Sequence, residues 1–243
     1  MSLGRMSVFF ILNEFYMKAD ENELKNILNK LNGTHEEEIL KSMQNLYFLI
    51  DDAQKIWYEK SGFTCVKSCG ECCRNFEPDL LECEALYMAA WLLENQKEVA
   101  GDIMDGKFPF PENTGCPFWN EHNDYHCTIY GGRPFICRFF GGCGSTDKEK
   151  KTVFKPCKFY PTKILEAHNP PLAHKQYSES EIMQIFGVLP LVTTDIMETA
   201  VSLNPDYHST ELLRSVLPKA IKRINWICNM AESLQQSNSL DTK

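Results

Sequence analysis

Cysteine residues cluster in the middle of this chain at spacings that suit metal binding. Four thiols fall within nine residues, in CVKSCGECC, and four more follow between residues 116 and 143. Soft thiolates select zinc, copper(I) or iron–sulfur centres, and no ordinary packing argument asks for such a density. We therefore predict a metal centre with eight candidate ligands. These are Cys65, Cys69, Cys72, Cys73, Cys116, Cys127, Cys137 and Cys143.

The sequence leaves open which of these cysteines share one ion. Neighbouring side chains usually diverge, so Cys72 and Cys73 either serve different metals or divide into one ligand and one packed residue. Cys157 is a further candidate that could replace one of the eight as a metal ligand. Cys83 and Cys228 fall on apolar faces of expected helices, where a free cysteine is simply a small buried hydrophobe.

The composition limits the class of protein. The chain has 243 residues, is 43% hydrophobic and carries a formal charge of −8, which disfavours broad binding to nucleic acid or anionic lipid. The apolar run from Val8 to Leu12 is too short for a secretory signal, and no stretch approaches the roughly 20 apolar residues of a membrane span. We predict a cytoplasmic protein with a metal ion or cluster as its partner, and leave a protein partner open.

Helices are expected on both sides of the cysteines. Thr34 and Glu37 form a capping box before an apolar stripe that ends at Ser61 and Gly62. A second helix is predicted from Asp79, as its cap, to about Lys97, and a last one over Leu212–Leu234. Residues 101–171 are rich in glycine, proline and cysteine and need more than a hydrophobic core to order them.

These elements predict a mainly α fold, with helices packed around a loop-rich, cysteine-clustered metal-binding centre. Within one compact domain we divide the chain into an N-terminal helical segment (1–62), a cysteine-cluster metal-binding region (63–160) and a C-terminal helical segment (161–243). Four cations lie among the cysteines and are expected to offset thiolate charge. They are Lys67, Arg74, Arg133 and Arg138.

The order of the motifs resembles a known family. CVKSCGECC, then CPFW, then CTIYGGRPFICRFFGGC is similar to the bacterial YkgJ-like cysteine-cluster family, written CxxCxxCC and described as a zinc- or iron-chelating domain. A flagellin lysine methylase is similar over the same region. Three residues separate the first two cysteines here, whereas the family has two. Cys65 is therefore not at the position of the family's first cysteine. The resemblance implies metal binding through Cys65, Cys69, Cys72, Cys73, Cys116, Cys127 and Cys137, with Cys143 as a further candidate.

Three functional hypotheses follow from these observations. The first is a metal-binding protein that holds an iron–sulfur cluster or zinc, with the cluster favoured. The second is a cluster-dependent enzyme, such as a protein-lysine methyltransferase or a redox enzyme. Cys65-x3-Cys69-x2-Cys72 also resembles the radical S-adenosylmethionine motif, although a long helix precedes it and Glu71 stands where an aromatic residue is usual. The third is a structural zinc module that binds a protein partner.

Overall fold

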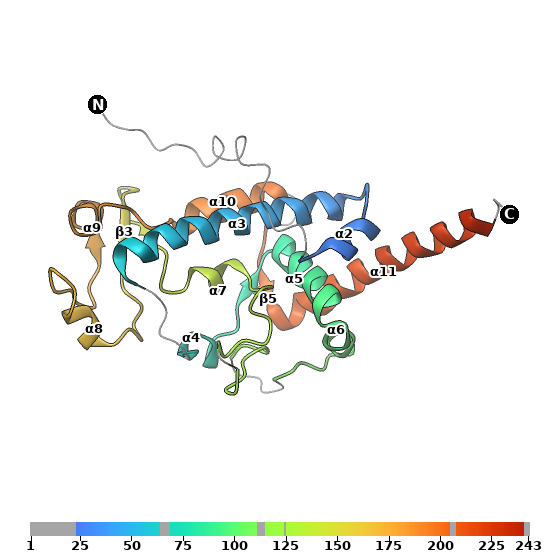
Figure 1. Cartoon of the computed structure of the whole chain (residues 1–243), viewed down its shortest axis with the longest axis horizontal. Coiled ribbons are helices and arrows are strands. Elements are labelled where there is room, and N and C mark those ends of the chain that lie inside the picture. The colour runs from blue at the N-terminus through green and yellow to red at the C-terminus, as the bar shows by residue number, and fades with distance from the viewer. Residues whose placement is uncertain (1–22, 64–68, 111–114, 124, 205–207, 241–243) are drawn as a thin grey trace, which may run out of the picture.

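The computed structural model describes residues 23–63, 69–110, 115–123, 125–204 and 208–240, with side chains up to residue 234. This part of the chain is mainly helical, as predicted (Figure 1). Across it, no helix combines the length and the apolar character that crossing a membrane requires. The helices are α2 (Lys25–Lys30), α3 (His35–Ser61), α4 (Glu71–Arg74), α5 (Glu82–Asn95), α6 (Lys97–Met104), α7 (Phe135–Phe139), α8 (Thr162–Glu166), α9 (Glu179–Phe186), α10 (Thr193–Leu203) and α11 (Leu213–Leu240).

Two small antiparallel sheets complete the described part of the fold. In one, β1 (Asp79–Leu80) pairs with β5 (Glu211–Leu212). In the other, β3 (Thr152–Phe154) lies between β2 (Ser145–Thr146) and β4 (Tyr177–Ser178). The strands are two or three residues long, so they join loops and add little to the core.

The long helix α3 begins and ends where its sequence predicts. The Thr34 side chain accepts a hydrogen bond from the backbone N–H of Glu37 (3.2 Å), and the Glu37 carboxylate accepts one from Gly33 N–H (2.7 Å). These bonds satisfy amides that have no partner within the helix. Gly62 ends it in the left-handed conformation, with φ of 69°. The apolar stripe is buried, and α3 runs along the molecule above α7 and α4 in Figure 1.

The predicted start of α5 is wrong. Asp79 does not cap this helix, because it lies in β1 and pairs with Leu212 of β5. The helix begins at Glu82, and the N–H of Leu81 donates to the Glu84 carboxylate (2.9 Å). Pairing with a residue 133 positions further along the chain competes with local capping, and one sequence window cannot reveal it.

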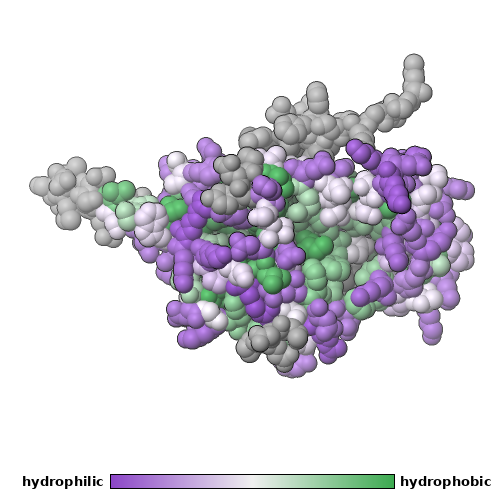
Figure 2. Space-filling model, turned by 180° about the vertical axis from the view of Figure 1, so that it is seen from behind, coloured by the Kyte–Doolittle hydropathy of each residue, from purple (hydrophilic) through white to green (hydrophobic). Residues whose placement is uncertain are grey.

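The main hydrophobic core joins segments from the whole length of the chain. Buried residues of α3, α5 and α11 form one cluster, with α2 packed against it. A smaller cluster surrounds Trp57 and Phe154 and includes residues of α8 and α9. Because α3 contributes to both clusters, it links the two ends of the molecule. In Figure 2, hydrophobic residues gather in a hollowed area that hydrophilic side chains border.

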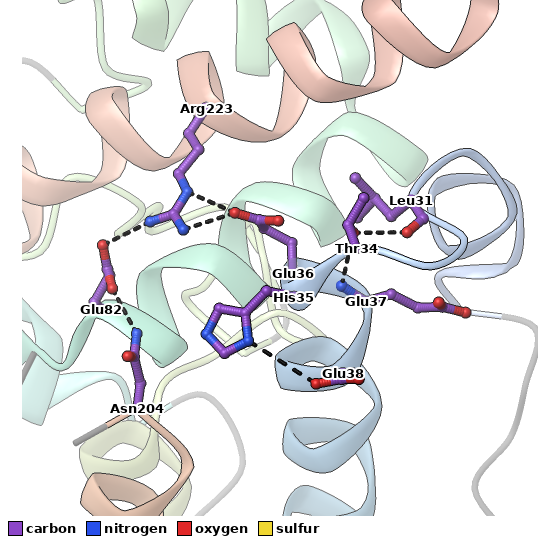
Figure 3. A network of polar contacts seen from close by, with 9 residues as sticks. All are labelled: Leu31, Thr34, His35, Glu36, Glu37, Glu38, Glu82, Asn204 and Arg223. Carbon is purple, nitrogen blue, oxygen red and sulfur yellow. Dashed lines mark hydrogen bonds and ion pairs between the residues drawn. The ribbon is translucent and has the colours of Figure 1, made fainter. Parts of the chain in front are cut away.

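A polar network fixes the positions of four helices. Arg223 of α11 donates to Glu36 of α3 (Nη2 to Oε1, 2.6 Å) and to Glu82 of α5 (Nη1 to Oε1, 2.9 Å). Asn204, after α10, donates to the other Glu82 oxygen (2.6 Å). Figure 3 shows Arg223 between the two carboxylates. One cation therefore compensates two acidic groups where α3, α5 and α11 meet.

Candidate metal centre

Six of the eight candidate ligands lie around one cavity of about 810 Å³. One wall comes from the C-terminal half of α3, which contributes Asp51, Gln54 and Tyr58. The opposite wall comes from α4, α7 and the loops between them. The six cysteines that line the cavity are Cys69, Cys72, Cys73, Cys116, Cys127 and Cys137. Segments far apart in sequence thus bring thiols to one space.

The adjacent cysteines of α4 converge. Gly70, in the left-handed conformation, starts this short helix, and the Cys72 and Cys73 sulfurs lie 3.7 Å apart. Two thiolates on one tetrahedral ion, with bonds of about 2.3 Å, are about 3.8 Å apart. The expectation that neighbouring side chains diverge does not hold here, and this pair has the spacing of two ligands on one metal.

The contact between the two sulfurs changes how easily each thiol ionises. The hydrogen bond from Cys73 lowers the pKa of the Cys72 thiol to about 7, against the opposing effect of burial. That bond, together with burial, raises the pKa of Cys73. Near neutral pH Cys72 therefore ionises more readily than Cys73 and supplies the thiolate form that binds metal. Burial raises the pKa of Cys116 to about 12, so metal binding there must release a proton.

Backbone contacts bring the second batch of cysteines to α4. The N–H of Cys116 donates to the Cys73 carbonyl (2.9 Å). Gly115 makes this approach possible, because its φ is +79° and a Cβ there would collide with the Arg74 carbonyl. Cys127 follows in a loop whose antiparallel bridge pairs it with Trp119. The thiols of Cys116 and Cys127 are thus positioned by the main chain.

A buried carboxylate sets the start of α7, which carries Cys137. Glu84 of α5 accepts the N–H of Phe135 (2.7 Å) as well as that of Leu81. Burial raises the pKa of Glu84 to about 7, although the two N–H groups act in the opposite direction. The sequence analysis did not identify Glu84 as functionally relevant. Its role becomes visible only in the folded chain, because its partner Phe135 is 51 residues away in the sequence.

Arg138 joins α7 to the opposite wall. Its guanidinium pairs with Asp51 of α3 (3.1 Å) and donates to the carbonyls of Gly131 (2.6 Å) and Arg133 (3.0 Å). Gln54 in turn donates to the Arg138 carbonyl (2.6 Å). Sequence reasoning missed Gln54, although a polar residue on the buried stripe of α3 was a usable signal. These bonds fix the distance between the two walls.

Arg133 is a cation beside several of the thiols. It lines the cavity, and its guanidinium lies 3.3 Å from the centre of the Tyr130 ring. Its charge contributes to the lowered pKa of Cys72 and opposes the effect of burial on Cys127 and Cys137. Two other predicted cations have acidic partners: Arg138 pairs with Asp51 and Arg74 with Glu71 (3.8 Å). Among the predicted cations that the structure describes, Arg133 is therefore the one whose charge favours the thiolate forms of Cys72, Cys127 and Cys137.

The remaining predicted residues lie elsewhere. Cys65 and Lys67 are outside the described residues. Cys143 does not line the cavity, and its sulfur contacts Gln54 Nε2 at 3.8 Å. Within the described ranges, no three His, Cys, Asp or Glu side chains form a group that could hold one metal ion. Thiols suit a thiophilic metal. The six cysteines line one cavity but are not grouped closely enough to coordinate an ion in this arrangement. Their role as ligands stays a prediction.

Comparison with known proteins confirms the family resemblance. Residues 64–163 match the CxxCxxCC family model, described as “Putative zinc- or iron-chelating domain”. The matched segment covers about two fifths of the chain and contains all six cysteines that line the cavity. No curated protein and no solved structure matches the chain. The similarity to a flagellin lysine methylase stays a prediction.

Proposed function

We propose that this protein holds an iron–sulfur cluster, in preference to zinc, through the cysteines of residues 64–163. The observation that carries the proposal is the convergence of six thiols on one cavity. Thiolates bind both iron–sulfur centres and zinc, and the family description names zinc and iron. We further propose a cytoplasmic location, where reduced thiols persist. In support, the ten described cysteines are free thiols.

The size and lining of the cavity favour a cluster. Its volume of about 810 Å³ far exceeds the ~30 Å³ that one water molecule occupies in the liquid. A single metal ion therefore does not need a cavity of this size. Apolar side chains contribute to its walls, among them Phe76, Met88, Ile129 and Phe140. Such a shell limits solvent access to a cluster and tunes its reduction potential. A structural zinc site is closed by its four ligands and needs no comparable space.

Metal analysis of the full chain tests the proposal. After anaerobic purification we expect iron, acid-labile sulfide and a broad visible absorption. Cys72→Ala and Cys137→Ala should each lose most of the metal. Cys228→Ala, on the buried face of α11 outside the cavity, is the control and should keep it. A colourless protein with stoichiometric zinc would favour the zinc module, and unchanged metal content in both variants would refute the ligand assignment.

The same cavity favours one second candidate, a cluster-dependent enzyme such as a protein-lysine methyltransferase or a redox enzyme. Catalytic centres keep space beside the metal for a substrate, and structural centres do not. Adding S-adenosylmethionine to the anaerobic protein should perturb the cluster spectrum if the centre is a methyltransferase. An unchanged spectrum would argue against the methyltransferase hypothesis and would not bear on the metal-binding proposal.

A further inference from the structure

A second cavity adjoins the candidate metal centre, and none of the described residues that line it is a cysteine. It has a volume of about 240 Å³ and lies between the middle of α3, α5 and the loop before α7. This volume is about eight times the ~30 Å³ that one water molecule occupies in the liquid, so it accommodates a small organic molecule. Aromatic rings form part of its walls, and four charged side chains line it. These are Glu23, Asp51, Arg133 and Arg138.

Two of the four charges neutralise each other. Arg138 is 7% exposed and pairs with Asp51 at 3.1 Å. Its guanidinium also donates to two backbone carbonyls and lies 4.0 Å from the centre of the Tyr47 ring, so it is held in place. Both members of the pair line the metal-centre cavity as well. The pair therefore lies at the boundary between the two cavities.

The other two charges have no ionic partner within the described ranges. Nε of Arg133 donates to the Tyr130 carbonyl (2.9 Å) and its guanidinium lies on the Tyr130 ring, but no described carboxylate pairs with it. Glu23 has no described cation beside it, and its nearest effect is on Tyr87, whose pKa is raised by burial and by the Glu23 charge. One cavity thus presents one uncompensated positive charge and one uncompensated negative charge.

The loop that carries Arg133 is packed closely against α5. Gly131 lines the cavity, and a Cβ on it would lie only 2.8 Å from the indole Nε1 of Trp91. A glycine is needed where the backbone approaches another group this closely. The Gly131 carbonyl also accepts a hydrogen bond from Arg138 (2.6 Å). Arg133 is therefore presented to the cavity from a fixed loop.

We propose that this cavity binds a small zwitterion of the amino-acid class, with its carboxylate at Arg133 and its ammonium group at Glu23. A guanidinium suits a carboxylate because it offers paired N–H donors. A simple anion would meet the like charge of Glu23, and a simple cation would meet that of Arg133, which disfavours both. The aromatic walls supply apolar area for the rest of the ligand. This binding does not depend on metal in the neighbouring cavity.

Isothermal titration calorimetry of the full chain, as isolated and with its metal content measured, tests the proposal. The standard L-amino acids are titrated one at a time, each against the matching acid without the amino group and the matching amine without the carboxylate. For alanine these controls are propionate and ethylamine. We expect saturable binding of at least one amino acid and about tenfold weaker binding of both of its controls, since each charge-assisted contact is worth about that factor. The inference is wrong if no amino acid binds, or if the matching acid binds equally well.

Two variants that each remove one charge identify the contacts. Glu23→Gln should weaken amino-acid binding about tenfold and abolish the preference over the matching acid, and Arg133→Gln should abolish the preference over the matching amine. Glu38→Gln, at an exposed position of α3 outside the cavity, is the control and should bind like the wild type. Thermal unfolding without ligand checks that the variants fold.

Glu23 lines this cavity and not the metal-centre cavity, so Glu23→Gln should keep the metal content of the wild type. Loss of metal binding in every protein would refute the proposed function and leave the zwitterion site standing. Wild-type affinity for the amino acid in Glu23→Gln would overturn the zwitterion site and leave the proposed function standing.

Discussion

Replacing Glu84 by glutamine should change how the stability of this protein depends on pH. The carboxyl group is 2% exposed, and burial raises its pKa from 4.5 to about 7. In the unfolded chain the ordinary value applies. Because the folded pKa is raised, the stabilising contribution is complete below about pH 4.5 and is lost as the pH rises through 7.

The magnitude follows from the two pKa values. They differ by about 2.5, which corresponds to ~3 kcal/mol. Linkage places most of this loss, about 2–3 kcal/mol, between pH 5 and pH 8. Glutamine does not titrate, so the variant escapes the loss. It has a single acceptor oxygen, however, and leaves the N–H of Leu81 or Phe135 unpaired, which costs about 1–3 kcal/mol at any pH.

Urea unfolding of the stripped proteins at pH 5, 6, 7 and 8 measures this difference. The wild type should be the more stable protein at pH 5. By pH 8 the difference in the free energy of unfolding between the two proteins should have shifted by about 2–3 kcal/mol in favour of Glu84→Gln. Other titrating groups occur in both proteins and cancel. Glu38→Gln, at an exposed position of α3, controls for the loss of a carboxylate. A constant difference across the range would show that Glu84 is already ionised at pH 5 and would refute the reasoning.

Three further predictions concern the framework of the site. Arg223→Met leaves Glu36 and Glu82 without their shared cation and should lower the free energy of unfolding by about 1–3 kcal/mol in chemical denaturation; an unchanged value would mean that solvent screens this network. Arg133→Gln should weaken metal retention in a chelator competition by about tenfold, with Arg133→Lys in between, because the thiolates lose a cation; equal retention in all three would exclude this role. Gly115→Ala should cost at least about 1–2 kcal/mol and reduce metal content, and a wild-type melting curve would contradict the collision with the Arg74 carbonyl.

Local signals predicted the flanking helices well. The cap at Thr34, the apolar stripe of α3 and the stop at Gly62 all lie within one window of the sequence, and each was confirmed. The cap of α5 was not predictable in this way, because Asp79 pairs with a strand near residue 212. Tertiary pairing overrides a local preference whenever it satisfies the same backbone groups.

The sequence by itself determined the family resemblance of residues 64–163, and the number, type and spacing of its cysteines predict a thiophilic metal. The tertiary structure alone decided the geometry. It placed six thiols around a cavity and set the Cys143 sulfur against the Gln54 amide. The physical reason is that metal preference resides in the ligand atom, whereas proximity depends on contacts between residues distant in the chain, such as those of Glu84 and Arg138.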